Sequence, residues 1–162
     1  MKRRAEAGGW HLMVAVLLIF TLHATPTVFA ADQVTPILGR VVGVHDGDTI
    51  TLRTQTNQTV KVRLLRIDAP EIGQPFGTKS KQALSSMVFG RDVLVASTGE
   101  DRYGRVLGDI RAGQVWANLM MVQLGMAWHY VKYDQRPELS AAEIEAHSSR
   151  RGLWSDPNAM PP

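Results

Sequence analysis

Two short acidic segments hold the side chains of this sequence that are best suited to chemistry. The first is Asp46-Gly47-Asp48-Thr49, and the second is Asp68-Ala69-Pro70-Glu71, which Arg63 shortly precedes. Carboxylate oxygens that lie close together suit a hard divalent cation, Ca²⁺ in particular. An arginine beside them suits a phosphate, which a guanidinium can bind through two hydrogen bonds. A metal ion, a phosphate clamp and a spare carboxylate are together what hydrolysis of a phosphodiester requires.

Both segments also have a purely structural interpretation. The Asp-Gly pair of the first segment is a hairpin signal and could be no more than a turn. Pro70 fixes the exit from a strand, so the acids around it could be solvated loop residues. The two segments fall at the ends of neighbouring predicted strands, which favours a metal site. Its oxygen ligands would include Asp48, Asp68 and the backbone carbonyl of Ala69.

The pattern of apolar residues predicts the elements that position these side chains. Alternation predicts strands at 37–44, 49–54, 59–67, 93–96 and 106–110. Helical spacing and helix-forming composition predict helices at 78–89, 115–124 and 138–150. Short strands with a helix after the third predict an α+β, mainly β architecture. We expect a five-stranded closed barrel of the oligonucleotide-binding type, an OB fold, with three helices.

The N-terminus has the layout of a secretory signal peptide. Lys2, Arg3 and Arg4 precede an apolar run over 12–22, and Val28-Phe29-Ala30 follows it. The run of about 11 residues is shorter than the roughly 20 that span a bilayer, which disfavours a membrane anchor. We therefore expect a signal peptide at 1–30, one domain at 31–162, and export to a periplasm or the extracellular medium. No membrane association is expected after cleavage.

Composition bounds the function further. The chain has no cysteine, so core packing or a bound ion must hold the exported fold. Residues 1–30 carry three of the 18 Lys and Arg and one of the 15 Asp and Glu, which leaves 15 against 14. A balance of +1 gives no support for nucleic-acid binding, which must rest on local patches.

Taken singly, Arg63 could be a rim residue of a barrel and Arg105 a surface turn residue. We expect a monomer.

The motifs in their order resemble a known family. Asp-Gly-Asp-Thr at 46–49, Arg-Leu-Leu-x-Ile-Asp-Ala-Pro-Glu at 63–71, Asp-Arg-Tyr-Gly-Arg at 101–105 and a late Gly-Leu-Trp at 152–154 resemble the staphylococcal (micrococcal) nuclease family, also called thermonuclease. The resemblance covers roughly residues 37–155. It implies a five-stranded barrel with three helices. It also implies a Ca²⁺-dependent nuclease that hydrolyses DNA and RNA with little sequence preference and leaves 3′-phosphate and 5′-hydroxyl ends.

The resemblance implies a role for each matching position near the metal. Asp48 and Asp68 would be side-chain ligands of Ca²⁺. Ala69 would supply a backbone carbonyl, where the best-known member of the family has threonine. Glu71 would be the general base for the attacking water.

The basic and aromatic positions would contact the substrate. By the same resemblance, Arg63 and Arg105 would bind the reacting phosphate and stabilise its developing charge. Arg102 and Tyr103 match positions of the family near the bound nucleotide. Tyr130 and Tyr133 are expected from their residue type alone to stack on a base, and the alternative for both is packing within the protein.

Two other functions compete with this one. The first is a barrel that binds single-stranded nucleic acid without cutting it, as catalytically inactive members of the family do. The second is an exported barrel that binds Ca²⁺ structurally or docks a protein. A module that only binds nucleic acid has no need of Glu71 beside a phosphate, because its charge repels. The presence of the full set favours the enzyme. That set is Asp48, Arg63, Asp68, Glu71 and Arg105.

Overall fold

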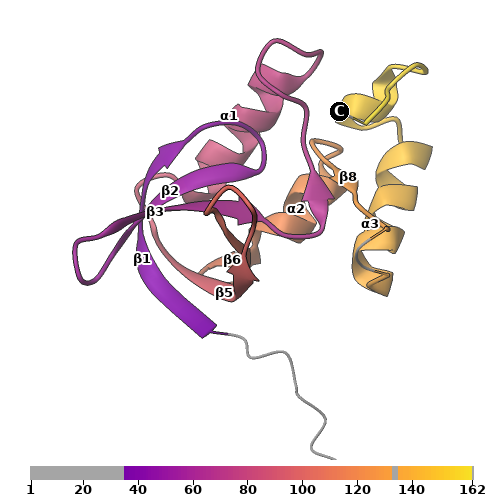
Figure 1. Ribbon diagram of the computed structural model, residues 1–162. Coiled ribbons are helices and arrows are strands. Elements are labelled where there is room, and N and C mark those ends of the chain that lie inside the picture. Colours follow the sequence, from indigo (N-terminus) through magenta and orange to yellow (C-terminus); the bar gives the residue numbers. More distant parts are fainter. Residues whose placement is uncertain (1–34, 133–134, 162) are drawn as a thin grey trace, which may run out of the picture. The chain divides into compact units, whose positions relative to one another are not determined.

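A closed barrel forms the body of the domain in the computed structural model (Figure 1). The structure describes residues 35–132 and 135–161, so the expected signal peptide at 1–30 and Tyr133 lie outside it. The barrel strands follow the order β3-β2-β1-β5-β6 with antiparallel neighbours, and β3 closes the ring by pairing parallel to β6. This confirms the predicted five-stranded barrel. The strands are β1 (Thr35–Val44), β2 (Thr49–Thr54), β3 (Thr59–Leu64), β5 (Asp92–Glu100) and β6 (Val106–Ala112).

Alternating side chains fill the barrel. Ile50 and Leu52 of β2 are fully buried, as are Val62 of β3, Val95 of β5 and Ile110 of β6. These β-branched and leucine side chains suit the pleated surface of a strand, and their period of two turns one face of every strand inward. The hydrophobic periodicity of the sequence therefore predicted the interior of the barrel.

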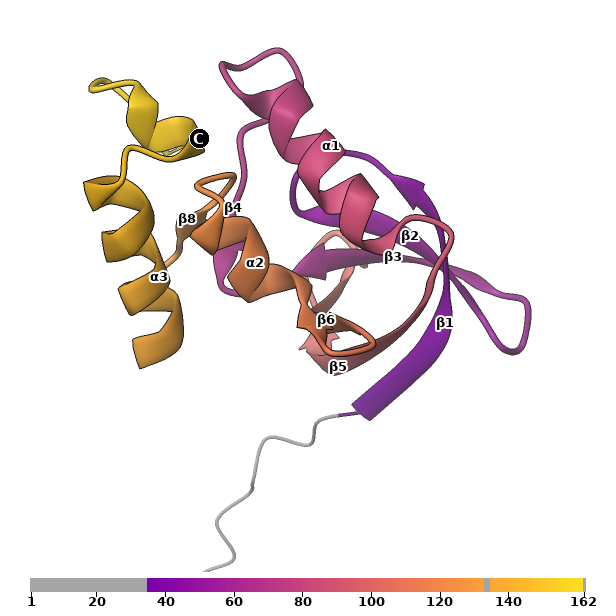
Figure 2. The ribbon, with the colours of Figure 1, turned by 180° about the vertical axis from the view of Figure 1, so that it is seen from behind.

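Three helices accompany the barrel, in the number predicted. They are α1 (Gly77–Val88), α2 (Ala117–Gln123) and α3 (Pro137–Ser148), followed by the 3₁₀ turn η1 (Gly152–Ser155). Helices α1 and α2 contact strands of the barrel, α1 also packs on α2, and α3 packs on α2 (Figure 2). Within the described ranges, no helix combines the length and the apolar character that crossing a membrane requires.

Several predicted boundaries are wrong. The largest difference is in β5, expected at 93–96, which continues to Glu100 and stays paired with β6. The strand expected at 59–67 ends at Leu64, because the backbone reverses at Arg66, which has a φ of 69°. Residues Ile67–Asp68 then form a separate strand, β4, which pairs antiparallel with β8 (Trp128–His129). The helix expected at 115–124 begins at Ala117, after the short strand β7 (Val115–Trp116). Alternation continues through the turn at Arg66, so the pattern gives no sign of the reversal.

A buried asparagine fixes this reversal to the barrel. The Asn118 side chain on α2 donates from Nδ2 to the Leu65 carbonyl at 2.9 Å and to the Gly108 carbonyl at 3.3 Å. Its Oδ1 accepts the backbone N–H of Ile110 at 2.9 Å. One fully buried side chain thus joins the turn after β3 to strand β6.

We expect Asn118→Ala to lower the free energy of unfolding by about 3 kcal/mol, since it leaves buried backbone groups without partners. Urea denaturation of the purified protein measures the change. Gln114→Ala, in the exposed turn before β7, is the matched control and should unfold like the wild type. Equal stability of the Asn118→Ala and control proteins would contradict this account of the turn.

Candidate active site

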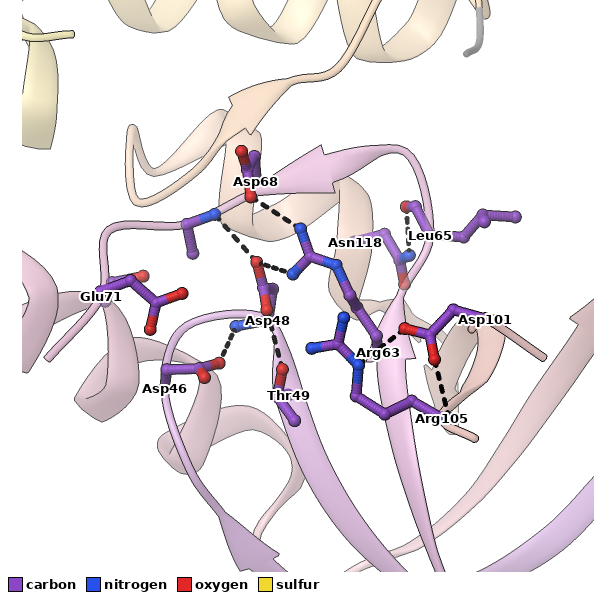
Figure 3. Close-up of polar contacts among 12 residues, drawn as sticks. Asp46, Asp48, Thr49, Arg63, Leu65, Asp68, Glu71, Asp101, Arg105 and Asn118 are labelled. Carbon is purple, nitrogen blue, oxygen red and sulfur yellow. Dashed lines mark hydrogen bonds and ion pairs between the residues drawn. The ribbon is translucent and has the colours of Figure 1, made fainter. Parts of the chain in front are cut away.

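Asp48 and Arg63, both singled out from the sequence, meet where β2 begins and β3 ends. Asp48 immediately precedes β2, and Arg63 lies opposite Thr49 in the β2–β3 register. The backbone N–H of Leu64 donates to the Asp48 carbonyl at 2.7 Å, so the ladder continues to the end of the barrel. Strand pairing therefore brings Asp48 and Arg63 together, as Figure 3 shows.

Asp48 is a buried carboxylate with several partners. Its residue is 3% exposed. Its Oδ1 accepts the Thr49 hydroxyl at 2.9 Å, and its Oδ2 accepts the Ala69 backbone N–H at 3.0 Å. Burial raises the pKa of Asp48 to about 6, against the lowering effect of the neighbouring Arg63 guanidinium. The carboxylate is therefore only partly compensated and favours further positive charge beside it.

Arg63 bridges the two aspartates. Its Nη1 pairs with Asp48 Oδ2, and its Nη2 donates to Asp68 Oδ1 at 2.7 Å. Burial opposes the charge of the guanidinium, but Asp48 and Asp68 outweigh it and raise the pKa of Arg63. Arg63 is therefore cationic at every accessible pH and acts as the counter-ion of both carboxylates.

Arg105 is held immediately before β6, the strand that pairs parallel with β3. Asp101 accepts the Arg105 Nε at 2.7 Å and the backbone N–H groups of Tyr103 and Arg105 at 2.9 and 3.0 Å. Burial tends to raise the pKa of Asp101, yet the hydrogen bonds from Arg105 and Tyr103 lower it below its usual value. A charged Asp101 thus fixes the Arg105 side chain just before β6, near Arg63 (Figure 3).

An exposed aromatic ring lies beside Arg105. The Tyr103 residue is 67% exposed, with the guanidinium carbons of Arg102 and Arg105 at 4.8 and 5.5 Å from its ring centroid. The Arg102 Nη2 also donates to the Tyr103 hydroxyl at 2.6 Å. A π-face flanked by two cations suits a base and its phosphate.

The remaining predicted contacts lie farther along the chain. Tyr130 is exposed just after β8, and its backbone N–H donates to the Arg66 carbonyl at 2.8 Å. Its role as a base contact stays a prediction. The same holds for Tyr133, which is outside the described residues.

Glu71 and Asp46 complete the acidic groups. Asp46 accepts the backbone N–H of Asp48 at 2.9 Å, so this aspartate makes the turn that the Asp-Gly signal predicts. Glu71 lies in the exposed loop between β4 and α1, and its side chain is directed toward the 46–48 segment in Figure 3. The site therefore combines a clamped pair of aspartates, two arginines and a solvent-facing carboxylate.

Sequence inspection missed three supporting residues. Thr49 donates its hydroxyl to Asp48, Asp101 holds Arg105, and Trp128 lies opposite Asp68 in the β4–β8 pair. Thr49 and Asp101 lie within the quoted motifs, each next to a charged residue. The sequence could therefore have indicated their supporting role. The pairing of Trp128 with Asp68 spans distant parts of the chain and had no local signal.

Comparison with known proteins identifies the family. The model of the family described as staphylococcal nuclease homologue matches residues 61–156. A Haemophilus influenzae protein named as an uncharacterized endonuclease is 42% identical over 151 residues, which cover 93% of this chain and 82% of the relative. A similarly named Escherichia coli protein is 43% identical, over 90% of this chain and 92% of its own.

A Shigella flexneri protein named micrococcal nuclease is 44% identical, over 76% of this chain and 77% of the relative. A continuous match over 76% of 162 residues covers the middle of the chain wherever it begins. This match, like the other two, therefore includes most of the barrel and both acidic segments. With the closed barrel and the cluster at its end, these findings show that the chain belongs to the staphylococcal nuclease homologue family.

Proposed function

We propose that this protein is an exported, Ca²⁺-dependent nuclease that hydrolyses DNA and RNA and leaves 3′-phosphate and 5′-hydroxyl ends. As a member of its family the chain is a phosphodiester hydrolase, and nucleic acid is its substrate class. The observation that carries the proposal of a Ca²⁺-dependent nuclease is the pair Asp48 and Asp68 joined through Arg63, with Arg105 immediately before the adjacent strand β6.

The donor set fits a hard cation. Asp48 and Asp68 offer carboxylate oxygens to one shared guanidinium, and buried Asp48 is only partly compensated by it. The described residues contain no group of three or more His, Asp or Glu side chains that could enclose a metal ion. Backbone carbonyls, that of Ala69 among them, and water would therefore complete the shell, as is usual for Ca²⁺ but not for Zn²⁺.

The chain's own residues would divide the chemistry among them. Glu71 accepts a proton from the attacking water, whose oxygen forms the new bond to phosphorus as the bond to the 5′ oxygen breaks. The 5′ oxygen takes a proton from solvent water and leaves as the 5′-hydroxyl. Arg63 and Arg105 donate to the phosphoryl oxygens on which charge develops, and Asp101 keeps Arg105 oriented. A Ca²⁺ ion held by Asp48, Asp68 and Ala69 would polarise the phosphoryl group and orient the water.

The substrate lies along the basic and aromatic surface. Arg102 and Tyr103 are proposed to contact the nucleotide next to the cleaved bond, because their exposed groups lie beside Arg105. Tyr130 and Tyr133 are proposed as further base contacts. Contacts to phosphate and to base faces discriminate little between DNA and RNA, which supports the broad specificity. The signal-like segment at 1–30 supports export.

We expect the purified protein to release acid-soluble fragments from denatured DNA in Ca²⁺ and not in a chelator. Glu71→Gln should lower the rate at least about 100-fold, within the range that general-base catalysis contributes. End-labelling of the products measures whether 3′-phosphates are formed.

Two other outcomes would change the assignment. A folded protein that binds single-stranded DNA but cuts nothing with any divalent ion would be the non-catalytic binding module. Ca²⁺-dependent melting without nucleic-acid binding would instead indicate a structural ion site. Cleavage that is equally fast in the chelator would remove the metal from the proposal.

A further inference from the structure

The loop that carries Glu71 is exposed, so apolar side-chain packing contributes little to its position. Residues 71–75 are all exposed. Behind their loop lies a cavity of about 250 Å³, lined by Pro70 and Gln74 on one side and by Trp128 and Met160 on the other. A loop with water on one face and a cavity on the other gains little from apolar contacts. Local hydrogen bonds must therefore hold the backbone of Glu71.

Gln74 supplies these hydrogen bonds in both directions. The backbone N–H of Glu71 donates to the Gln74 side-chain Oε1 at 2.7 Å. The backbone N–H of Gln74 donates in return to the Glu71 carbonyl at 3.0 Å. The chain reverses between them at Gly73, whose φ of 100° is accessible to glycine without penalty. The side chain of Gln74 thus closes the turn that begins at Glu71.

The first residue of α1 connects this turn to the body of the protein. The backbone N–H of Gly77 donates to the Gln74 carbonyl at 3.0 Å. A Cβ at Gly77 would lie 2.0 Å from the Glu71 carbonyl oxygen, so helix α1 starts directly against the Glu71 backbone. The turn is therefore a small rigid unit attached to a helix, with the Glu71 side chain directed toward the 46–48 segment (Figure 3).

We propose that Gln74 is a positioning residue for Glu71. Its amide oxygen holds the Glu71 N–H and thereby aims the carboxylate at the water that it deprotonates. This inference rests on the role proposed above for Glu71. A general base must lie within hydrogen-bonding reach of the proton that it accepts, so small displacements of the turn reduce turnover.

Three variants test the inference. Gln74→Met keeps the length of the side chain and removes the acceptor, whereas Gln74→Glu keeps an acceptor oxygen. Gln82→Met, on an exposed position of α1, is the matched control. We expect Gln74→Met to lower kcat by about 10- to 100-fold with KM for denatured DNA changed by less than about threefold. Gln74→Glu should restore kcat to within about fivefold of the wild type, and the control should match it.

A double variant separates positioning from a general structural role. If Gln74 acts through Glu71, adding Gln74→Met to Glu71→Gln should change the residual kcat by less than about twofold. The melting temperatures of the single variants show whether the fold is intact. Equal losses in both backgrounds, a change in KM alone, or a wild-type kcat for Gln74→Met would each overturn the inference.

The activities of the variants distinguish a wrong role for Gln74 from a wrong role for Glu71. A slow Glu71→Gln protein with a fast Gln74→Met protein would refute only the role of Gln74. A Glu71→Gln protein as active as the wild type would refute the general base, and with it the need to position one.

Discussion

Arg63→Gln is expected to bind Ca²⁺ more tightly than the wild type at pH 9 and yet to cleave nucleic acid about 1,000-fold more slowly. Metal affinity rises while the cleavage rate falls because Arg63 has two alternative partners, the aspartates and the phosphate, and cannot bind both at once. In the structure its guanidinium bridges Asp48 and Asp68. In the proposed reaction the same guanidinium donates to the phosphoryl oxygens. Loss of one such donor typically costs about 10²- to 10³-fold in turnover.

The gain in affinity follows from competition for the aspartates. A cation that binds Asp48 and Asp68 in the wild type must take over carboxylates that Arg63 already neutralises. Without Arg63 the pair has no counter-ion, and the pKa of Asp48 rises further because Arg63 no longer lowers it. At pH 9, where Asp48 is ionised in both proteins, we therefore expect the Ca²⁺ dissociation constant to fall by about tenfold, or ~1.4 kcal/mol. The metal-free variant should lose about 3 kcal/mol of stability, because one partner of a buried ion pair is removed.

Titration calorimetry with Ca²⁺ at pH 9 and single-turnover cleavage measure the two effects. Arg53→Gln, an exposed arginine on β2, is the control and should change neither. Arg63→Lys keeps the charge but not the two-pronged geometry, so it should recover stability better than turnover. A variant that binds Ca²⁺ more weakly than the wild type would show that Arg63 assists the metal rather than competes with it.

The barrel was predictable because its signal is local. Ile50 and Leu52 alternate with polar residues on β2, and Val60, Val62 and Leu64 do so on β3. A few residues are therefore enough to predict which face of each strand points inward. The short connections between the strands leave few ways to pair them. The acidic segments were predictable for the same reason, since each is contiguous in the sequence.

The supporting contacts were not predictable because they join distant segments. Asn118 reaches the Leu65 carbonyl across 53 positions in the chain, and Trp128 faces Asp68 only because β4 leaves the barrel. The reversal at Arg66 that makes this possible is a backbone conformation that a non-glycine residue rarely adopts. Tertiary structure selects it, so no propensity could indicate it. The bridge made by Arg63 likewise depends on the register of two strands.

Asp48→Asn is expected to stabilise the metal-free protein at pH 7 while it weakens Ca²⁺ binding by more than about 100-fold. Asp48 has a pKa of about 6 in the folded state, against 3.8 for an aspartate in an unfolded chain. Its ionisation in the buried site therefore costs about 3 kcal/mol at neutral pH. Asparagine removes this cost but leaves Arg63 only Asp68 as a partner, so a net gain of about 1–3 kcal/mol is expected.

The pH dependence distinguishes this effect from a general change in packing. A raised pKa in the folded state means that the folded protein binds the proton more tightly. The stabilising contribution of protonated Asp48 is thus complete below pH 3.8 and is lost as the pH rises through about 6. The advantage of Asp48→Asn should shrink as the pH falls from 7 toward 4.5. Urea denaturation in a chelator measures it, and a difference that is constant with pH would contradict the assignment.

Ca²⁺ should favour the ionised form of Asp48, whereas burial favours the protonated form. Ca²⁺ requires ionised Asp48, so protons compete with it below a pH of about 6. There the apparent dissociation constant for Ca²⁺ should rise by roughly tenfold per pH unit. Calorimetry between pH 5 and 7.5 measures this slope, with phosphate-free buffers of different protonation enthalpy to count the protons released. Proton release that peaks below pH 6 is expected only if a buried carboxylate binds the ion, because exposed aspartates are already ionised there.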